Sequence, residues 1–189
     1  MARLVDAAQE IVSFLREQGW PCCIVGGLAV PAWGEPRSTA DVDICLYTGL
    51  GDEQSYIELI LERFTPRISD AREFAERSRV ILVQASNGIG VDIALAWTPF
   101  ESRMLARATP FEFTASIALP IASAEDVVIM KAFAGRPHDW VDVQGVLVKQ
   151  RGKLDWSYIQ QELSALCELK EAPEILDKLQ QIQERVDAE

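Results

Sequence analysis

Apolar residues follow a helical period at the start of the chain and then change to short continuous runs. Residues 3–18 are predicted to form a helix that ends at Gly19, with four apolar side chains on one face: Leu4, Ala8, Ile11 and Leu15. Residues 22–25 and 42–47 are apolar runs bounded by glycine, proline or polar residues, which is typical of buried strands. Between them, residues 28–33 have helical character.

The middle of the chain continues to alternate helix with strand. A helix that includes residues 57–64 is predicted to close before Pro66. Strands are predicted over 79–85 and 91–96, and the Asn87-Gly88 pair between them favours an antiparallel hairpin. A fifth strand is expected within residues 111–119, which completes a small mixed sheet.

The last third of the chain has the pattern of helices. Ser123 is expected to cap a helix that runs to about Gly135, because Asp126 supplies the acid that a capping box prefers. Three further helices are predicted: one from Pro137, one over 155–169 and one over 174–186. The pattern therefore predicts an α/β (α+β) protein in which a mixed β-sheet is flanked by helices. We expect a core over residues 1–122 and a helical C-terminal part over 123–189.

Composition narrows the classes of partner. The formal net charge is −11, which argues against a broad electrostatic grip on nucleic acid and is compatible with a cationic small substrate. No apolar stretch approaches the ~20 residues that a membrane span needs, and no signal peptide is visible, so we expect no membrane association. The four cysteines show no metal-like pairing, which favours a reducing, cytoplasmic location.

Two groups of residues suggest phosphate chemistry. Gly26-Gly27 follows the first strand, where backbone N–H groups and a following helix start can approach a phosphate. Asp41 and Asp43 are two residues apart at the start of a strand, so their side chains point to one face and can share a divalent cation. Asp92 lies amid apolar strand residues, where an acid requires explanation and could complete the cluster.

The order of these features resembles the nucleotidyltransferase fold of the DNA polymerase β superfamily. Arg37-Ser38-Thr39 before the Asp pair and a downstream series narrow the resemblance to minimal and AbiEii toxin-type nucleotidyltransferases; the series is Glu125, Asp126, Lys131, Arg136, Asp139 and Asp142. The resemblance implies Mg²⁺, with Mn²⁺ as a substitute, bound by Asp41, Asp43 and Asp92, which are also the catalytic residues. It implies that the nucleotide is bound by Gly26, Gly27, Arg37, Thr39, Lys131 and Arg136.

Simpler structural roles stay open for several of these residues. Thr39 and its neighbours can support the Asp-bearing strand instead of contacting phosphate. A lysine such as Lys131 on an otherwise apolar helix more often snorkels to solvent, and Asp139 and Asp142 can pair with Lys131 or Arg136 instead of meeting substrate.

The implied reaction transfers a nucleoside monophosphate (NMP) from an NTP to an acceptor hydroxyl. We expect a toxin-type enzyme that acts on tRNA or protein and has an antitoxin partner. The alternatives are modification of a small molecule such as an aminoglycoside, and a non-catalytic nucleotide-binding module that kept the fold.

Overall fold

The computed structural model describes residues 1–188 of the 189-residue chain, which divide into two compact units. The first unit comprises Met1–Leu28 and Ser38–Ala122, and the second comprises Ala29–Arg37 and Ser123–Glu189. The segment Ala29–Arg37 is thus grouped with the C-terminal helices, whereas the sequence pattern divides the chain only at residue 122. The division into domains over 1–122 and 123–189 stays a prediction. Each unit is described by itself.

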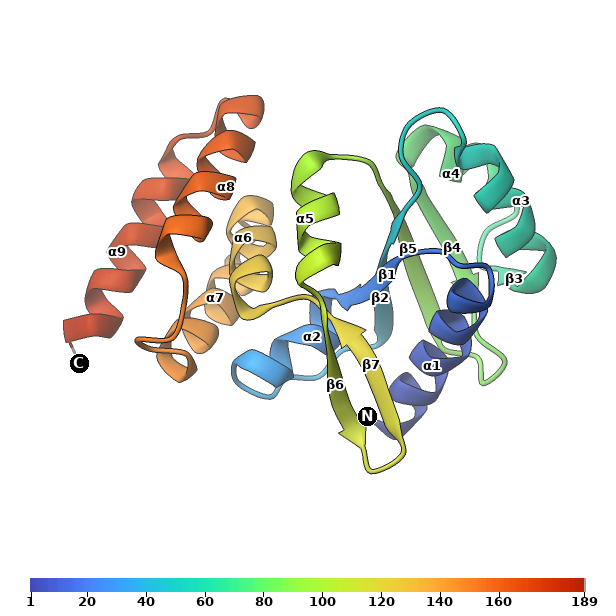
Figure 1. Ribbon diagram of the computed structural model, residues 1–189, viewed down its shortest axis with the longest axis horizontal. Helices are drawn as coiled ribbons and strands as arrows, with labels where there is room; N and C mark the ends of the chain where they lie inside the picture. Colours follow the sequence, from blue (N-terminus) through green and yellow to red (C-terminus); the bar gives the residue numbers. More distant parts are fainter. Residues whose placement is uncertain (189) are drawn as a thin grey trace. The chain divides into compact units, whose positions relative to one another are not determined.

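The first unit is built on one mixed sheet of seven strands in the order β3-β4-β5-β2-β1-β7-β6 (Figure 1). β2 pairs parallel with β5, and β1 pairs parallel with β7; the other neighbours are antiparallel. The strands are β1 (Cys22–Val25), β2 (Asp41–Tyr47), β3 (Thr65–Pro66), β4 (Val80–Gln84), β5 (Gly90–Ala96), β6 (Thr109–Thr114) and β7 (Ile117–Ile121). The predicted hairpin of the third and fourth strands is confirmed as the antiparallel pair β4·β5.

Alternation along the central strands separates an apolar face from a face that carries acids. Val42, Ile44 and Leu46 of β2 are buried in the main core with Val91, Ile93 and Leu95 of β5. The helices α1 (Ala2–Glu17) and α3 (Glu53–Arg63) supply the other side of this core through residues such as Ile11 and Ile57. Because successive strand residues point to opposite faces, Asp41, Asp43 and Asp92 lie on the face away from that core.

The structure contains elements that the hydrophobic pattern does not predict. α4 (Ala71–Ser78) is short and charged, and its buried residues are alanines, so it has no strong apolar stripe. α5 (Pro99–Arg107) begins at a capping box formed by Thr98 and Glu101. The expected single strand within 111–119 is wrong: β6 and β7 form a hairpin there, as Figure 1 shows. Its turn at Ala115-Ser116 lacks the Asn or Gly that signals a tight hairpin.

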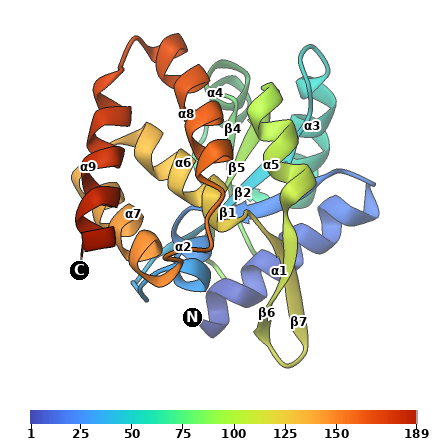
Figure 2. The same cartoon turned by 60° about the vertical axis from the view of Figure 1, so that its left-hand side comes forward.

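The second unit is helical and matches the predicted series closely (Figure 2). Its helices are α6 (Ala124–Ala134), α7 (Pro137–Lys149), α8 (Trp156–Lys170) and α9 (Glu174–Ala188), and the end of α2 (Gly26–Trp33) also belongs to it. Ser123 caps α6 by accepting a hydrogen bond from the Asp126 N–H at 3.2 Å, as predicted. Gly135 ends α6 with φ +70°, a left-handed conformation that glycine adopts without strain. Within residues 1–188, no helix is long and apolar enough to cross a membrane.

Candidate active site

The three aspartates predicted from the sequence lie side by side on adjacent strands. Asp43 on β2 is the register partner of Asp92 on the parallel strand β5, so their side chains leave the same face of the sheet at neighbouring positions. Asp41, two residues earlier on β2, faces the same way and has Gly90 as its partner on β5. β2 occupies the sheet between β5 and β1, which places these acids near the middle of the sheet.

Each carboxylate has a different partner. The Gly27 N–H donates to Asp43 Oδ2 at 3.2 Å, and the Thr39 hydroxyl donates to Asp41 Oδ1 at 3.1 Å. Asp92 forms an ion pair with the Arg67 guanidinium. The contact of Thr39 with Asp41 supports the alternative in which this threonine steadies the Asp-bearing strand.

The electrostatic environment of Asp92 links the three acids. Burial raises the pKa of the Asp92 carboxyl above its ordinary value. Arg67 opposes that shift and lowers the pKa, while the negative charges of Asp43 and Asp41 raise it again, and the net shift is upward. The like charges are therefore close enough to disfavour one another, and a cation shared among them would relieve this repulsion.

The donor set fits a hard divalent cation in its chemistry, and the three carboxylates leave the same face of the sheet. Carboxylate oxygens are the ligands that Mg²⁺ prefers, and three of them project from neighbouring positions on one sheet face. Within residues 1–188, however, no three His, Cys, Asp or Glu side chains are already gathered closely enough to form a metal cage. In this structure Gly27, Thr39 and Arg67 each contact a different one of the three carboxylates.

Gly26 combines a left-handed backbone, which favours glycine, with a position that leaves no room for a side chain. Its φ is +60°, and a Cβ built there would overlap the carboxylate of Asp43. The tight turn that joins β1 to α2 thus lets the backbone approach Asp43 and lets the Gly27 N–H reach Oδ2. The sequence indicates Gly26 and Gly27 as phosphate-binding residues; here they also position a carboxylate.

We predict that Gly26→Ala lowers stability and displaces the Asp43 side chain. The left-handed backbone alone costs about 1–2 kcal/mol for alanine. Gly19→Ala is the matched control, because Gly19 has φ +73° and a methyl group added there would have nothing within 4 Å. Denaturant unfolding should show a larger loss for Gly26→Ala than for Gly19→Ala. Equal losses would mean that the approach to Asp43 has no energetic consequence.

The other predicted nucleotide-binding residues meet in an ion-pair cluster of the second unit. Lys131 Nζ lies 3.1 Å from Asp139 Oδ1 and 2.8 Å from Asp142 Oδ2. Arg37 Nε lies 3.3 Å from Asp142 Oδ1, and Arg136 Nε donates to Asp139 Oδ2 at 2.6 Å. The alternative in which Asp139 and Asp142 pair with these cations therefore describes the structure.

The three cations of this cluster differ in exposure. The Lys131 side chain is 8% exposed, against 35% for Arg37 and 62% for Arg136. The alternative in which Lys131 snorkels to solvent does not describe the structure, because two carboxylates hold its ammonium inside. Burial by itself raises the pKa of Asp139, but hydrogen bonds from Arg136 and Lys131 outweigh it and lower that pKa.

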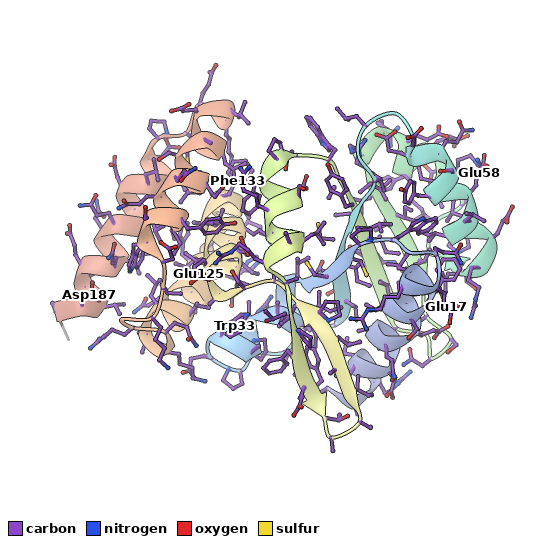
Figure 3. All side chains as sticks on the ribbon, in the orientation of Figure 1. Glu17, Trp33, Glu58, Glu125, Phe133 and Asp187 are labelled. Atoms are coloured by element: carbon purple, nitrogen blue, oxygen red, sulfur yellow. The ribbon has the colours of Figure 1, made fainter. Side chains whose placement is uncertain are left out.

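The loop that follows α2 is tied to the helices of its own unit. Lys149 Nζ donates to the Gly34 carbonyl at 2.9 Å, and Gln150 Nε2 donates to the carbonyl of Trp33 at 2.9 Å; Trp33 is labelled in Figure 3. A Cβ at Gly34 would lie 2.9 Å from a methyl carbon of Val146 on α7. These contacts hold the chain that leads to Arg37 against α7.

Arg67 is the site residue that the sequence pattern misses. It follows Pro66, before which the preceding helix is predicted to end, and nothing in the local pattern connects it with Asp92. One signal is present: Gly90 lies at the start of β5, and a glycine in a strand often marks the close approach of another group. The approaching group is Arg67, whose Nη1 would lie 2.6 Å from a Cβ at Gly90.

Comparison with known proteins identifies the family and the fold. The family model described as "Nucleotidyltransferase of unknown function (DUF6036)" matches residues 2–177. An antigenic nucleotidyltransferase-like protein from Paracoccidioides brasiliensis has a similar structure, with TM-score 0.54, 15% sequence identity, and coverage of 94% of this chain and 92% of that chain. The antibiotic-resistance factor ANT(2'')-Ia, solved in solution, gives TM-score 0.50 at 17% identity, covering 99% of this chain and 92% of that chain. No curated protein matches the sequence. At these identities the two structures show the fold, and the predicted nucleotidyltransferase-type fold is confirmed.

Proposed function

This chain belongs to that family of nucleotidyltransferases, and we propose that it is an active, Mg²⁺-dependent enzyme that transfers an NMP group from an NTP to an acceptor hydroxyl. The observation that carries the proposal is the register of β2 and β5, which puts Asp43 beside Asp92 with Asp41 on the same face. The turn at Gly26-Gly27, which hydrogen-bonds to Asp43, adds backbone N–H groups at the same place.

Asp41 and Asp43 would hold the metal, and Asp92 would complete the ligand set. Bound Mg²⁺ would neutralise charge on the phosphate oxygens; Mn²⁺ would substitute for it. Asp92 would also help to deprotonate the acceptor hydroxyl. The acceptor oxygen then bonds to the α-phosphorus, the bond from that phosphorus to the bridging oxygen breaks, and pyrophosphate leaves.

The resemblance implies that residues of the stretch 26–39, together with Lys131 and Arg136, would bind the phosphates of the nucleotide. Gly26 and Gly27 offer backbone approach, and Thr39 stands next to Asp41. Arg37, which is half-buried, and Arg136, which is exposed, would donate from their guanidinium groups to phosphate oxygens. The ammonium of Lys131 is paired with Asp139 and Asp142. Lys131 would therefore contribute to nucleotide binding through these ion pairs.

For the acceptor, we propose tRNA or a protein, as the resemblance to AbiEii toxin-type nucleotidyltransferases implies, with an antitoxin as the controlling partner. The net charge of −11 favours a second candidate, a cationic small molecule such as an aminoglycoside. A non-catalytic nucleotide-binding module of the same fold is the third candidate, and the presence of all three acids speaks against it.

The proposal predicts transfer of label from the α-phosphate of an NTP and none from the γ-phosphate. The protein, Mg²⁺ and each of the four NTPs would be incubated with cell extract, and RNA, protein and small-molecule fractions would then be separated. Label in the RNA or protein fraction, lost on RNase or protease treatment respectively, supports the leading candidate. Label in the small-molecule fraction alone supports the second candidate. No transfer with any NTP, together with nucleotide binding, would leave only the non-catalytic module.

A further inference from the structure

Arg67 continues a row of residues that crosses the sheet to the aspartates. Its N–H donates to the Leu82 carbonyl at 3.0 Å, which places it opposite Leu82 just beyond β3. Leu82 on β4 is the register partner of Asp92 on β5, and Asp92 is the partner of Asp43 on β2. Register partners share a face, so Arg67 reaches over β4 toward the acidic face and ends in an ion pair with Asp92.

Gly90 makes room for the guanidinium. A Cβ at this position would lie 2.6 Å from Arg67 Nη1 and 3.3 Å from its Cζ, which is too close for the guanidinium to stay in place. The backbone of Gly90 is not in the left-handed region, so the backbone conformation alone does not require glycine here. Space is what this glycine supplies, and Arg67 fills that space next to Asp92.

We infer that Arg67 is a positioning residue whose guanidinium pairs with Asp92 and holds that carboxylate in place. A divalent cation must displace this guanidinium before Asp92 can become its ligand. This inference rests on the proposed metal site. A guanidinium stays charged at any physiological pH, so it leaves Asp92 only by moving away. Asp92 is thus held by a positive charge that would repel an incoming cation. Arg67 and a divalent cation therefore compete for Asp92, and the cation gains this ligand only when the guanidinium moves away.

The test is Mn²⁺ binding to the nucleotide-free protein, followed by electron paramagnetic resonance of the free ion. Arg67→Ala is expected to bind Mn²⁺ about three- to fivefold more tightly than the wild type. This gain corresponds to removing the Arg67–Asp92 ion pair, which is about one-third exposed and competes with the cation for Asp92. Gly90→Ala keeps the positive charge but forces the guanidinium to shift, so it should tighten binding less than Arg67→Ala does. Arg67→Gln repeats the first change with a longer neutral side chain.

Arg72→Ala is the matched control, since Arg72 also forms an ion pair in the first unit, with Glu58 at 2.7 Å (Glu58 is labelled in Figure 3). It should leave Mn²⁺ affinity unchanged. Equal or weaker Mn²⁺ binding by Arg67→Ala and Arg67→Gln would overturn the inference. So would tighter binding by Arg67→Ala and Arg72→Ala alike, because that is a general effect of net charge. Asp43→Asn distinguishes a failure of the inference about Arg67 from a failure of the proposed metal site. If Asp43→Asn binds Mn²⁺ as the wild type does, the proposed metal site itself is wrong.

Discussion

Asp43→Asn is expected to abolish metal-supported NTP binding and to lower nucleotidyl transfer by about a thousandfold, since a bound metal ion contributes several kcal/mol to the stability of the transition state. Asp43 is the central acid of the three: it is two residues from Asp41 on β2 and beside Asp92 in the register. Replacing its carboxylate with an amide removes the negative charge that both neighbours would share with the cation. NTP titration with and without Mg²⁺, on the same samples as the transfer assay, measures both effects.

The fold should survive this change, which makes the experiment specific. Asn keeps a side-chain oxygen that can accept the hydrogen bond from the Gly27 N–H, now made to Asp43 Oδ2. Asp6→Asn, at an exposed position of α1, is the control for the loss of one negative charge in the same unit. An Asp43→Asn protein with wild-type melting temperature that still binds NTP in a Mg²⁺-dependent way would contradict the metal site.

The part of the site that the sequence predicts depends on local periodicity. The two-residue spacing of Asp41 and Asp43 puts them on one face of any strand, and Asp92 stands out among apolar strand residues. Strand identity and alternation are enough to predict which face these side chains use. The parallel pairing of β2 with β5, which brings Asp43 beside Asp92, cannot be read from the spacing; the resemblance implies only that the three acids share a metal.

The parts that the sequence pattern misses depend on contacts between residues distant in sequence. Arg67 and Asp92 are 25 residues apart, and their pairing follows from the order of β3, β4 and β5 in the sheet. α4 escapes prediction because alanines, which are weak markers of a buried stripe, form its buried face. The capping box at Thr98 and Glu101 is a signal in the sequence for the start of α5. The tight hairpin of β6 and β7 has no such signal, because Ala115-Ser116 is not a typical turn pair.

Lys131 shows most clearly how burial changes the meaning of a sequence motif. The motif places a basic residue where the resembled family binds phosphates, and the structure places its ammonium between two buried carboxylates. Asp139 is fully buried and Asp142 is nearly so. Breaking a buried ion pair from one side is costly, because the remaining charge loses its partner without regaining water.

Lys131→Ala is therefore expected to destabilise the protein by about 3–5 kcal/mol. Lys153→Ala, at an exposed lysine of the same unit, should change stability little. The pKa of Asp139 is lowered in the folded wild type, so its stabilising contribution is present above the pKa of the unfolded chain, about 4, and is lost as pH falls through the folded pKa.

The stability difference between wild type and Lys131→Ala should consequently be full at pH 7 and should narrow as pH falls below about 4 and through the lowered pKa of Asp139 in the folded wild type. Adding Asp139→Asn and Asp142→Asn to Lys131→Ala should recover part of the lost stability at pH 7, because the unpaired charges are then gone. Denaturant unfolding across this pH range, with NTP titration on the same samples, measures both roles of the residue. A Lys131→Ala protein as stable as the wild type that binds NTP weakly would show that the ammonium serves the nucleotide and not the fold.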